Sequence, residues 1–367
     1  MSIKTIDPNL ANFGVKETDV EWISAHDPRF SLHGVIYDDE QGLYTRVPRK
    51  VAESVSSSVA FLSYRTSGGR LRFVSDSPYI AIKAALPAFK PMPHMSITGS
   101  HGFAVYVDGH FIQRFSPSID AFFDTGIDYS SPLTSRIRFA ESKSTLTECE
   151  LGEHLYEIYF PLYGGIAELY IGIKSGSVLK SAPKYKHERP LLFYGSSIMQ
   201  GACVSRPGAD FASIIARKLD SDYINLGFSG SGNAEKEIID HIISIDASLY
   251  AYDYNLYDSR PERVLPPHYD IYKRIRNAHP DSVILLYDKP AYEHDSTFKR
   301  RRDIIRATYE RAREEGDERI ALVEATELFA GEDVGDCLTD SSHPNELGAM
   351  RMATAMYDKI KHFFEEE

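Results

Sequence analysis

Residues 191–201 read Leu-Leu-Phe-Tyr-Gly-Ser-Ser-Ile-Met-Gln-Gly, and this stretch decides how the second half of the chain folds. Four apolar residues end at Gly195, and a second glycine follows at Gly201. A short apolar run bounded by turn residues is typical of a buried strand. We therefore predict a strand that turns at Gly195 into a helix. This turn leaves the hydroxyl group of Ser197 at the end of the strand.

The alternation of strand and helix continues through the rest of the chain. Further apolar runs predict buried strands at residues 223–226, 249–252, 283–287 and 320–323. Helical stretches lie between and after them, at residues 209–219, 234–245, 262–278, 297–314 and 345–364. This alternation implies a parallel sheet with helices on both faces. We expect an α/β fold, a three-layer α/β/α domain with a five-stranded parallel sheet, whose site lies at the carboxyl ends of the strands.

The first half of the chain has the pattern of an antiparallel protein. Short alternating runs occur at residues 69–74, 79–84, 103–107 and 168–174. Asp108-Gly109 lies between two such runs and is a strong signal for a two-residue hairpin. We expect an antiparallel β-sandwich that resembles a jelly roll. Residues 181–190 are polar, contain two prolines and predict a linker. The predicted domains are therefore 1–183, the sandwich, and 184–367, the α/β domain.

Charge and cysteine content narrow the classes of partner. The 367 residues include 41 lysines and arginines against 53 acidic residues, a formal net charge of −12, which argues against a nucleic-acid partner. The basic run at 299–302 is predicted to be a solvated helix face.

Cys149, Cys203 and Cys337 fit no CxxC pattern, which favours a reduced compartment and no zinc site of cysteine type. The chain starts without the apolar segment of a signal peptide, and no window approaches about 18 apolar residues. We expect a cytoplasmic protein with no membrane partner.

Three residues form a candidate nucleophilic site. Ser197 ends the first predicted strand, and Asp340 and His343 lie three residues apart before the last predicted helix. A serine hydroxyl becomes a good nucleophile when a histidine takes its proton and a carboxylate holds that histidine in the right tautomer. Each residue also has a simpler explanation. Ser197 or Asp340 would then cap a helix, and His343 would be a surface histidine.

Two further segments follow the second and third predicted strands. Residues 225–233 form a glycine-rich loop that contains Gly230, and Asn255 ends the run that begins at Tyr252. A flexible turn or a phosphate cradle would also use a glycine-rich loop, but the spacing is not Gly-x-Gly-x-x-Gly. Asn255 would also suit an ordinary turn. Placed at the carboxyl edge of the sheet, the N–H groups of Ser197 and Gly230 and the amide of Asn255 could instead form an oxyanion hole.

In order, these four segments resemble those of the SGNH (GDSL-type) hydrolase superfamily, whose signature residues are a serine, a glycine, an asparagine and a histidine. The resemblance covers about residues 190–364. It implies that Ser197 is the nucleophile, His343 the base and Asp340 its orienting acid. It also implies that Ser197, Gly230 and Asn255 form the oxyanion hole. The subgroup with an N-terminal β-sandwich is the most similar, because it has Gly-Ser-Ser-Ile and Ser-Arg-Pro-Gly segments, here at 195–198 and 205–208.

The sandwich of that subgroup carries a Gly-x-Asp-Leu-Tyr signature, which corresponds here to residues 102–106 with Asp and Leu replaced. The resemblance implies a serine esterase that removes acetyl or other short acyl groups from carbohydrates, with an acylated oligosaccharide as its substrate. Asp253, Arg206 and Asn233 are candidate substrate-binding residues. An acyltransferase to a small acceptor, a lipid-type acyl esterase and a non-catalytic carbohydrate-binding protein remain alternatives. We expect no cofactor and no metal, and the sandwich is a candidate contact surface in a homo-oligomer.

Overall fold

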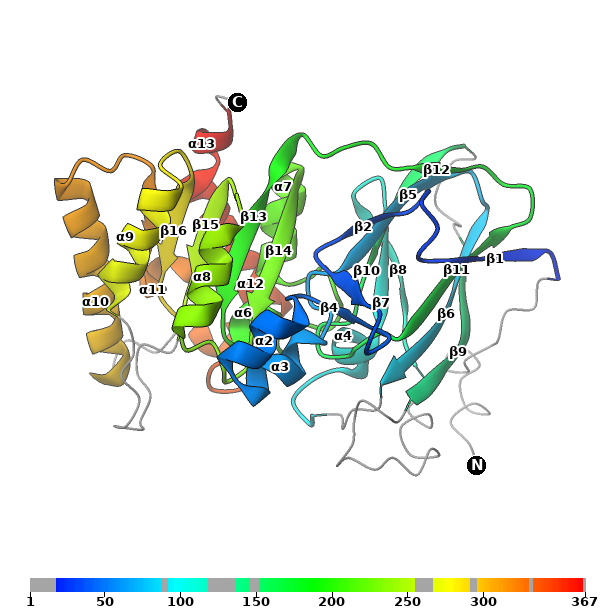
Figure 1. Ribbon diagram of the computed structural model, residues 1–367, viewed down its shortest axis with the longest axis horizontal. Coiled ribbons are helices and arrows are strands. Elements are labelled where there is room, and N and C mark those ends of the chain that lie inside the picture. Colours follow the sequence, from blue (N-terminus) through cyan, green and yellow to red (C-terminus); the bar gives the residue numbers. More distant parts are fainter. Residues whose placement is uncertain are drawn as a thin grey trace.

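The computed structural model describes residues 18–87, 92–117, 136–145, 152–254, 267–290, 296–329 and 333–365. Two units lie side by side (Figure 1). The first part of the chain forms a sandwich unit, built from strands β1 to β12, and the second part forms an α/β unit around strands β13 to β17. The predicted fold class is therefore confirmed. Within the described ranges, no helix is long and apolar enough to cross a membrane.

The sandwich unit contains two antiparallel sheets. Strands of the first sheet run in the order β1-β11-β6-β9, and those of the second in the order β12-β5-β10-β7-β8, with β2 paired to β5. Their bounds are β1 Val20–Ser24, β2 Ser31–His33, β5 Arg70–Ser75, β6 Tyr79–Pro87, β7 Phe103–Val107, β8 His110–Phe115, β9 Arg136–Thr145, β10 His154–Tyr159, β11 Glu168–Lys174 and β12 Leu179–Ser181. A separate pair joins β3 Ile36–Asp38 to β4 Leu43–Thr45.

Apolar side chains from both sheets form one core, because alternate residues of a strand point to the same face. Leu71 and Phe73 of β5 and Ile80 and Ile82 of β6 are fully buried in it. The hairpin predicted at Asp108-Gly109 joins β7 to β8, and both residues have positive φ, at 48° and 81°. Such dihedral angles are those that a tight hairpin turn requires.

The α/β unit has a five-stranded parallel sheet in the order β14-β13-β15-β16-β17. The strands are β13 His187–Gly195, β14 Ser221–Gly227, β15 Leu249–Tyr252, β16 Val283–Tyr287 and β17 Ile320–Val323, and each contains the apolar run that predicted it. Side chains alternate between two cores. Leu191 and Phe193 face one side of the sheet, and Leu192 and Tyr194 face the other. A sheet buried on both faces explains why these strands are continuously apolar.

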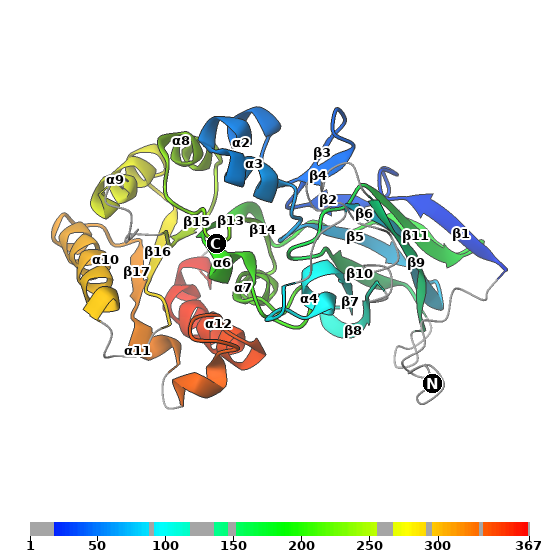
Figure 2. The ribbon, with the colours of Figure 1, turned by 90° about the horizontal axis from the view of Figure 1, so that it is seen from below.

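Helices cover both faces of this sheet (Figure 2). On one face lie α7 and α12 with the short α11 and α13, and on the other lie α8, α9 and α10. The bounds are α7 Phe211–Leu219, α8 Lys236–Ser244, α9 His268–Ala278, α10 Ser296–Glu314, α11 Ala325–Leu328, α12 Glu346–Ile360 and α13 His362–Glu365. Side chains cap several of the helices, among them α7 and α12. Asp210 accepts a hydrogen bond from Ser213 N–H at α7, and Asn345 accepts one from Gly348 N–H at α12.

Three helices that the sequence analysis did not predict belong to the first part of the chain. They are α2 Arg49–Val55, α3 Ser57–Ser63 and α4 Ile97–His101. The first two pack with α8 on the α/β unit, where Val47, Ala52 and Val59 join the core beside that helix. Residues 47–63 therefore lie within the predicted sandwich domain by sequence, but cover a face of the parallel sheet in space.

Two predictions need correction. The linker spans residues 182–186 and not 181–190, because β12 ends at Ser181 and β13 begins at His187. The basic run is only partly solvated. Lys299 is exposed, whereas Arg301 is 4% exposed and pairs with the carboxylates of Asp253 and Asp288. A helix of 3.6 residues per turn cannot keep four consecutive residues on one face, so one of them turns toward the sheet.

Candidate active site

Ser197 lies where β13 turns into a short helix, α6 (Ser197–Gln200), at the carboxyl edge of the sheet. Backbone segments crowd this turn. A β-carbon at Gly227 would lie 2.2 Å from the nitrogen of Gln200, and one at Gly232 would lie 2.3 Å from the carbonyl oxygen of Gly195. Glycine at these two positions lets the loop after β14 approach the turn that carries Ser197. The glycine-rich loop is therefore a packing requirement of the serine turn.

The structure brings Ser197, His343 and Asp340 into one chain of hydrogen bonds. Ser197 Oγ lies 2.8 Å from His343 Nε2, and His343 Nδ1 lies 2.8 Å from Asp340 Oδ2. With Nδ1 protonated, the ring donates to the carboxylate and Nε2 accepts from the serine hydroxyl. This arrangement can withdraw a proton from Ser197 as its oxygen attacks an electrophile.

Asp340 is held by its own turn. Its Oδ1 accepts hydrogen bonds of 2.8 Å from the N–H groups of Ser342 and His343. Although burial acts to raise it, the hydrogen bonds from the His343 side chain and from these two N–H groups lower the pKa of Asp340 to about 2. The carboxyl is therefore ionised at neutral pH. A hydrogen bond from Thr339 N–H to the carbonyl oxygen of His343 closes the turn just before α12.

Two of the predicted oxyanion donors fall in the described part of the chain. The N–H of Ser197 is at the first residue of α6, and Gly230 is an exposed loop residue with a φ of 66°. Among the described residues, neither N–H donates a hydrogen bond. Both amides are therefore available to an incoming oxygen atom. Asn255 lies outside the described residues.

Residues of the sandwich unit support the serine turn, a role that the sequence analysis missed. Gln200 donates through Nε2 to the carbonyl oxygen of Leu162 at 3.1 Å and accepts through Oε1 from Ser229 N–H at 3.0 Å. Tyr163 donates to the carbonyl oxygen of Ser197 at 3.4 Å. Gln200 therefore joins the sandwich unit to the loop that carries Gly230. No local sequence signal marks such contacts, because the partners are about 30 or more residues apart.

A second missed feature is a group of side chains around His343. His94, from the sandwich unit, lies over the His343 ring, with ring centroids 5.7 Å apart. Cys203 is buried, has a φ of 71°, and lies near Asp340. Burial and the charge of Asp340 raise the pKa of the Cys203 thiol to about 11. Positive φ is uncommon for a residue with a side chain, and such strain is concentrated at functional sites.

The three predicted substrate-binding residues have mainly structural contacts. Asp253 is 3% exposed and pairs with Arg301, which also donates to the carbonyl oxygen of Tyr254 at 2.7 Å. Asn233 is 5% exposed and donates to Glu235 at 3.2 Å. Arg206 lies over the Phe111 ring, with its guanidinium carbon 4.2 Å from the ring centre. Asp253 and Asn233 therefore fix the ends of β15 and of the glycine-rich loop.

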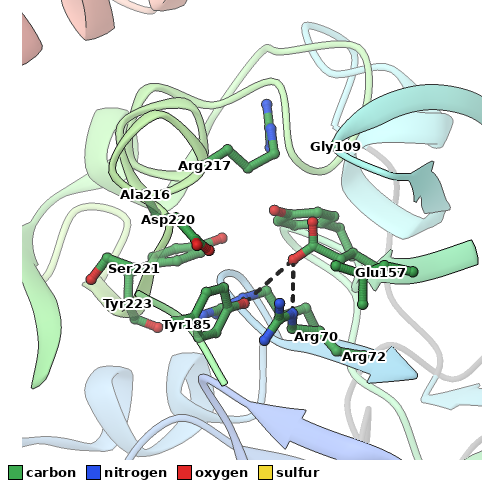
Figure 3. A pocket seen from close by; sticks show the side chains of 12 residues that line it. Arg70, Arg72, Gly109, Glu157, Tyr185, Ala216, Arg217, Asp220, Ser221 and Tyr223 are labelled. Atoms are coloured by element: carbon green, nitrogen blue, oxygen red, sulfur yellow. Dashed lines mark hydrogen bonds and ion pairs between the residues drawn. The ribbon is translucent and has the colours of Figure 1, made fainter. Parts of the chain in front are cut away.

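A cavity of about 190 Å³ lies between the two units, at the amino-terminal edge of the parallel sheet (Figure 3). Its polar side chains bond to one another. Glu157 accepts from Tyr185 at 3.4 Å and pairs with Arg72 at 3.2 Å, and Arg70 donates to Tyr185 at 2.8 Å. None of the predicted site residues lines this cavity. The cavity lies at the opposite edge of the parallel sheet from Ser197. We therefore assign its network of polar side chains to the contact between the two units.

Two family models match the chain. The GDSL-like lipase/acylhydrolase family matches residues 188–361, and the N-terminus of SGNH-hydrolase-type esterases, GxDLY, matches residues 20–179. Together they span both units. The chain therefore belongs to the SGNH (GDSL-type) hydrolases, a family of esterases and acylhydrolases, and to the branch with an N-terminal sandwich. A comparison with curated protein sequences gives no significant match.

Solved structures share the whole architecture. A putative GDSL-like lipase from Bacteroides ovatus has a TM-score of 0.74 and 23% identity, over 94% of this chain and 98% of that one. The salicylyl-acyltransferase SsfX3 from a tetracycline biosynthetic pathway has a TM-score of 0.72 and 20% identity, over 94% and 97%. A family two carbohydrate esterase from Clostridium thermocellum, solved with cellohexaose, has a TM-score of 0.54 and 15% identity, over 81% and 92%. These similarities are evidence of a shared fold.

Proposed function

We propose that the protein is a serine esterase that removes short acyl groups, foremost acetyl, from carbohydrates. The observation that carries this proposal is the hydrogen-bonded chain from Ser197 through His343 to Asp340. This hydrogen-bonded chain lies after the carboxyl end of β13 and in the turn before α12. Open α/β sheets bind their ligands at the carboxyl ends of the strands.

The geometry supports a two-step acyl transfer. His343 Nε2 takes the proton of Ser197 as its Oγ attacks the ester carbonyl, and Asp340 stabilises the imidazolium that forms. The N–H groups of Ser197 and Gly230 stabilise the oxyanion, and Asn255 is the expected third donor. His343 then gives the proton to the leaving hydroxyl. In the second step, it activates a water molecule that releases the acid and restores Ser197.

The carbohydrate part of the proposal rests on the combined architecture. The Clostridium thermocellum carbohydrate esterase, solved in complex with cellohexaose, has a similar fold over 81% of this chain, which includes parts of both units. His94, an exposed residue of the sandwich unit that lies over the His343 ring, is suited to a polar substrate. We infer that an acylated oligosaccharide enters beside His94 and reaches the serine turn.

An acyltransferase is the second candidate, and the higher TM-score of 0.72 with a salicylyl-acyltransferase favours it. It would use the same residues. In that case a small hydroxyl acceptor, and not water, would attack the acyl-enzyme. Product analysis in the presence and absence of sugar or alcohol acceptors separates the two, because only a transferase forms the new ester faster than the free acid.

The central experiment compares wild type with Ser197→Ala on p-nitrophenyl acetate and on a panel of acetylated oligosaccharides. We expect Ser197→Ala to keep its fold, by circular dichroism, and to lose ester hydrolysis and labelling by a fluorophosphonate probe. His343→Ala should be affected more severely than Asp340→Asn, because the base is required for proton transfer and the carboxylate only orients it. Undiminished activity of Ser197→Ala would overturn the proposal.

The same experiment resolves the substrate class. A series of p-nitrophenyl esters with increasing chain length should show the highest kcat/KM for acetate. A preference for long chains would point to a lipid-type esterase. Acetate release from none of the oligosaccharides, with p-nitrophenyl acetate still cleaved, would remove the carbohydrate assignment and keep the esterase.

A further inference from the structure

Four side chains that can bind a metal converge beside the serine turn. They come from three separate segments: His94 from the sandwich unit, Cys203 from the residues after α6, and Asp340 and His343 from the turn before α12. One ligand atom from each lies within 4.8 Å of all the others. The donors are two imidazole nitrogens, a thiol sulfur and a carboxylate oxygen, a set that zinc binds well.

The distances are close to those of a tetrahedral zinc site. With bonds of about 2.0–2.3 Å, tetrahedral ligand atoms lie about 3.5 Å apart. The four donors therefore need to move inward by about 1 Å or less, which side-chain rotation can supply. His94 is exposed and its ring is accessible to such a movement. Cys203 is buried, and its sulfur lies within 4.8 Å of a carboxylate oxygen of Asp340.

We propose that His94, Cys203, Asp340 and His343 form a binding site for a thiophilic divalent cation such as Zn²⁺, and that the bound cation switches the serine site off. The reason for inhibition lies in the two bonds of His343. One ring nitrogen lies 2.8 Å from Ser197 Oγ and the other lies 2.8 Å from Asp340. A cation on Nε2 removes the acceptor for the serine proton. A cation on Nδ1 displaces the carboxylate that orients the ring.

Cation binding also changes the charge of the site. Cys203 loses its proton to solvent when its sulfur binds the metal, and both imidazoles bind in the neutral form. A thiolate and a carboxylate then neutralise the two positive charges of the cation. Hard cations such as Mg²⁺ and Ca²⁺ prefer oxygen ligands and should not be held by this set.

The site joins the two units through His94. A cation would therefore also fix the sandwich unit to the serine turn, which brings the segment that carries His94 closer to His343. Metal binding by these four residues does not depend on the esterase activity, whereas inhibition rests on the proposed function. The two are measured separately.

The first measurement is calorimetric titration of Zn²⁺ and of Mg²⁺ into wild type, Cys203→Ser and His94→Gln, without substrate. We expect one Zn²⁺ per chain in wild type. Loss of a direct ligand should weaken binding at least about 100-fold, since even the groups that orient ligands contribute 10- to 100-fold. His110→Gln, which removes an exposed histidine of β8, is the matched control and should bind as wild type does.

The second measurement is p-nitrophenyl acetate hydrolysis with increasing Zn²⁺, followed by EDTA. Wild type should be inhibited and should recover with EDTA. Cys203→Ser should keep its basal turnover, and the turnover that remains in Cys203→Ser and in His94→Gln should resist Zn²⁺. Unchanged Zn²⁺ affinity in Cys203→Ser, no binding in wild type, or faster hydrolysis with Zn²⁺ would each overturn the inference. Zn²⁺ binding that is lost in both variants, in a protein without esterase activity, would establish the metal site and refute the proposed function.

Discussion

Replacing Gly232 with alanine should slow ester hydrolysis about 100-fold while the protein stays folded. The new β-carbon would lie 2.3 Å from the carbonyl oxygen of Gly195 and 3.2 Å from the nitrogen of Ser196, whereas ordinary van der Waals contact begins at 3.4 Å. Both neighbours are backbone atoms, so the glycine-rich loop and the serine turn must separate by about 1 Å. A displacement of this size between reacting groups costs about 100-fold in rate.

The expected cost in folding is smaller. Overpacking of this kind lowers the free energy of unfolding by about 1–3 kcal/mol, which should leave the domain folded at 25 °C. Ser231→Ala is the matched control, because it also places alanine in the glycine-rich loop but at the neighbouring residue, where a β-carbon is already present. It should hydrolyse p-nitrophenyl acetate at nearly the wild-type rate.

The assay is kcat for p-nitrophenyl acetate, with urea unfolding as the measure of stability. We expect kcat to fall in Gly232→Ala with KM little changed, since the substrate still reaches the site but the oxyanion donors are displaced from Ser197. A kcat within about twofold of wild type would refute the reasoning, because a backbone shift of about 1 Å would then have no effect on the chemistry.

Three further predictions test the electrostatics of the fold. Arg301→Met should lower the free energy of unfolding by about 3–5 kcal/mol, because it removes the ion-pair partner of the buried Asp253 carboxylate. Lys299→Met in the same basic run should change it by less than about 0.5 kcal/mol, and equal effects in urea unfolding would contradict the burial of Arg301. Burial lowers the pKa of His268 from 6.5 to about 3. Between these two pH values the unfolded chain binds a proton at this residue and the folded protein does not, so the free energy of unfolding should fall as the pH falls from 6.5 toward 3. His268→Gln should flatten the pH dependence of unfolding by about 1.4 kcal/mol per pH unit between pH 6 and 4, and an unchanged slope would exclude His268 as its cause. The pKa of Asp340 is lowered from 3.8 to about 2, so the ionised carboxylate stabilises the folded protein above pH 4, and this stabilisation is lost toward pH 2. The free energy of unfolding of Asp340→Asn, measured in urea, should therefore differ from that of wild type at pH 7 and approach it at low pH. A difference that stays constant with pH would refute this explanation.

Sequence patterns were reliable where the signal is local. The strands of the parallel sheet were placed within about two residues in four of five cases, because a strand buried on both faces must be apolar throughout. The start of β13 was missed, since His187 to Pro190 are not an apolar run and join the sheet through an irregularity before Leu191. Helices α2 and α3 were also missed. They are short, and their partner surface, beside α8, belongs to a distant part of the chain.

The sequence predicted some residues of the candidate site and missed others. Ser197, Asp340 and His343 could be predicted because each follows a strand or precedes a helix, and strand ends meet at one edge of a parallel sheet. Gln200, His94 and Cys203 carry no such signal. Arg301 was assigned to solvent, because charge in a helix usually faces water, and only the position of α10 over two buried carboxylates shows that it does not.

By itself, the sequence determined the order of strands and helices and the segments that meet at the carboxyl edge of the parallel sheet. The physical reason is that periodicity and turn residues act over a few residues. Only the tertiary structure decided which distant groups meet: the hydrogen bond from Ser197 to His343, the support of the serine turn by Gln200 and Tyr163, and the cluster of four side chains for which we propose metal binding. Such contacts depend on how helices, strands and the two units pack against one another, and packing is set by the shapes of whole surfaces, which no short stretch of residues encodes.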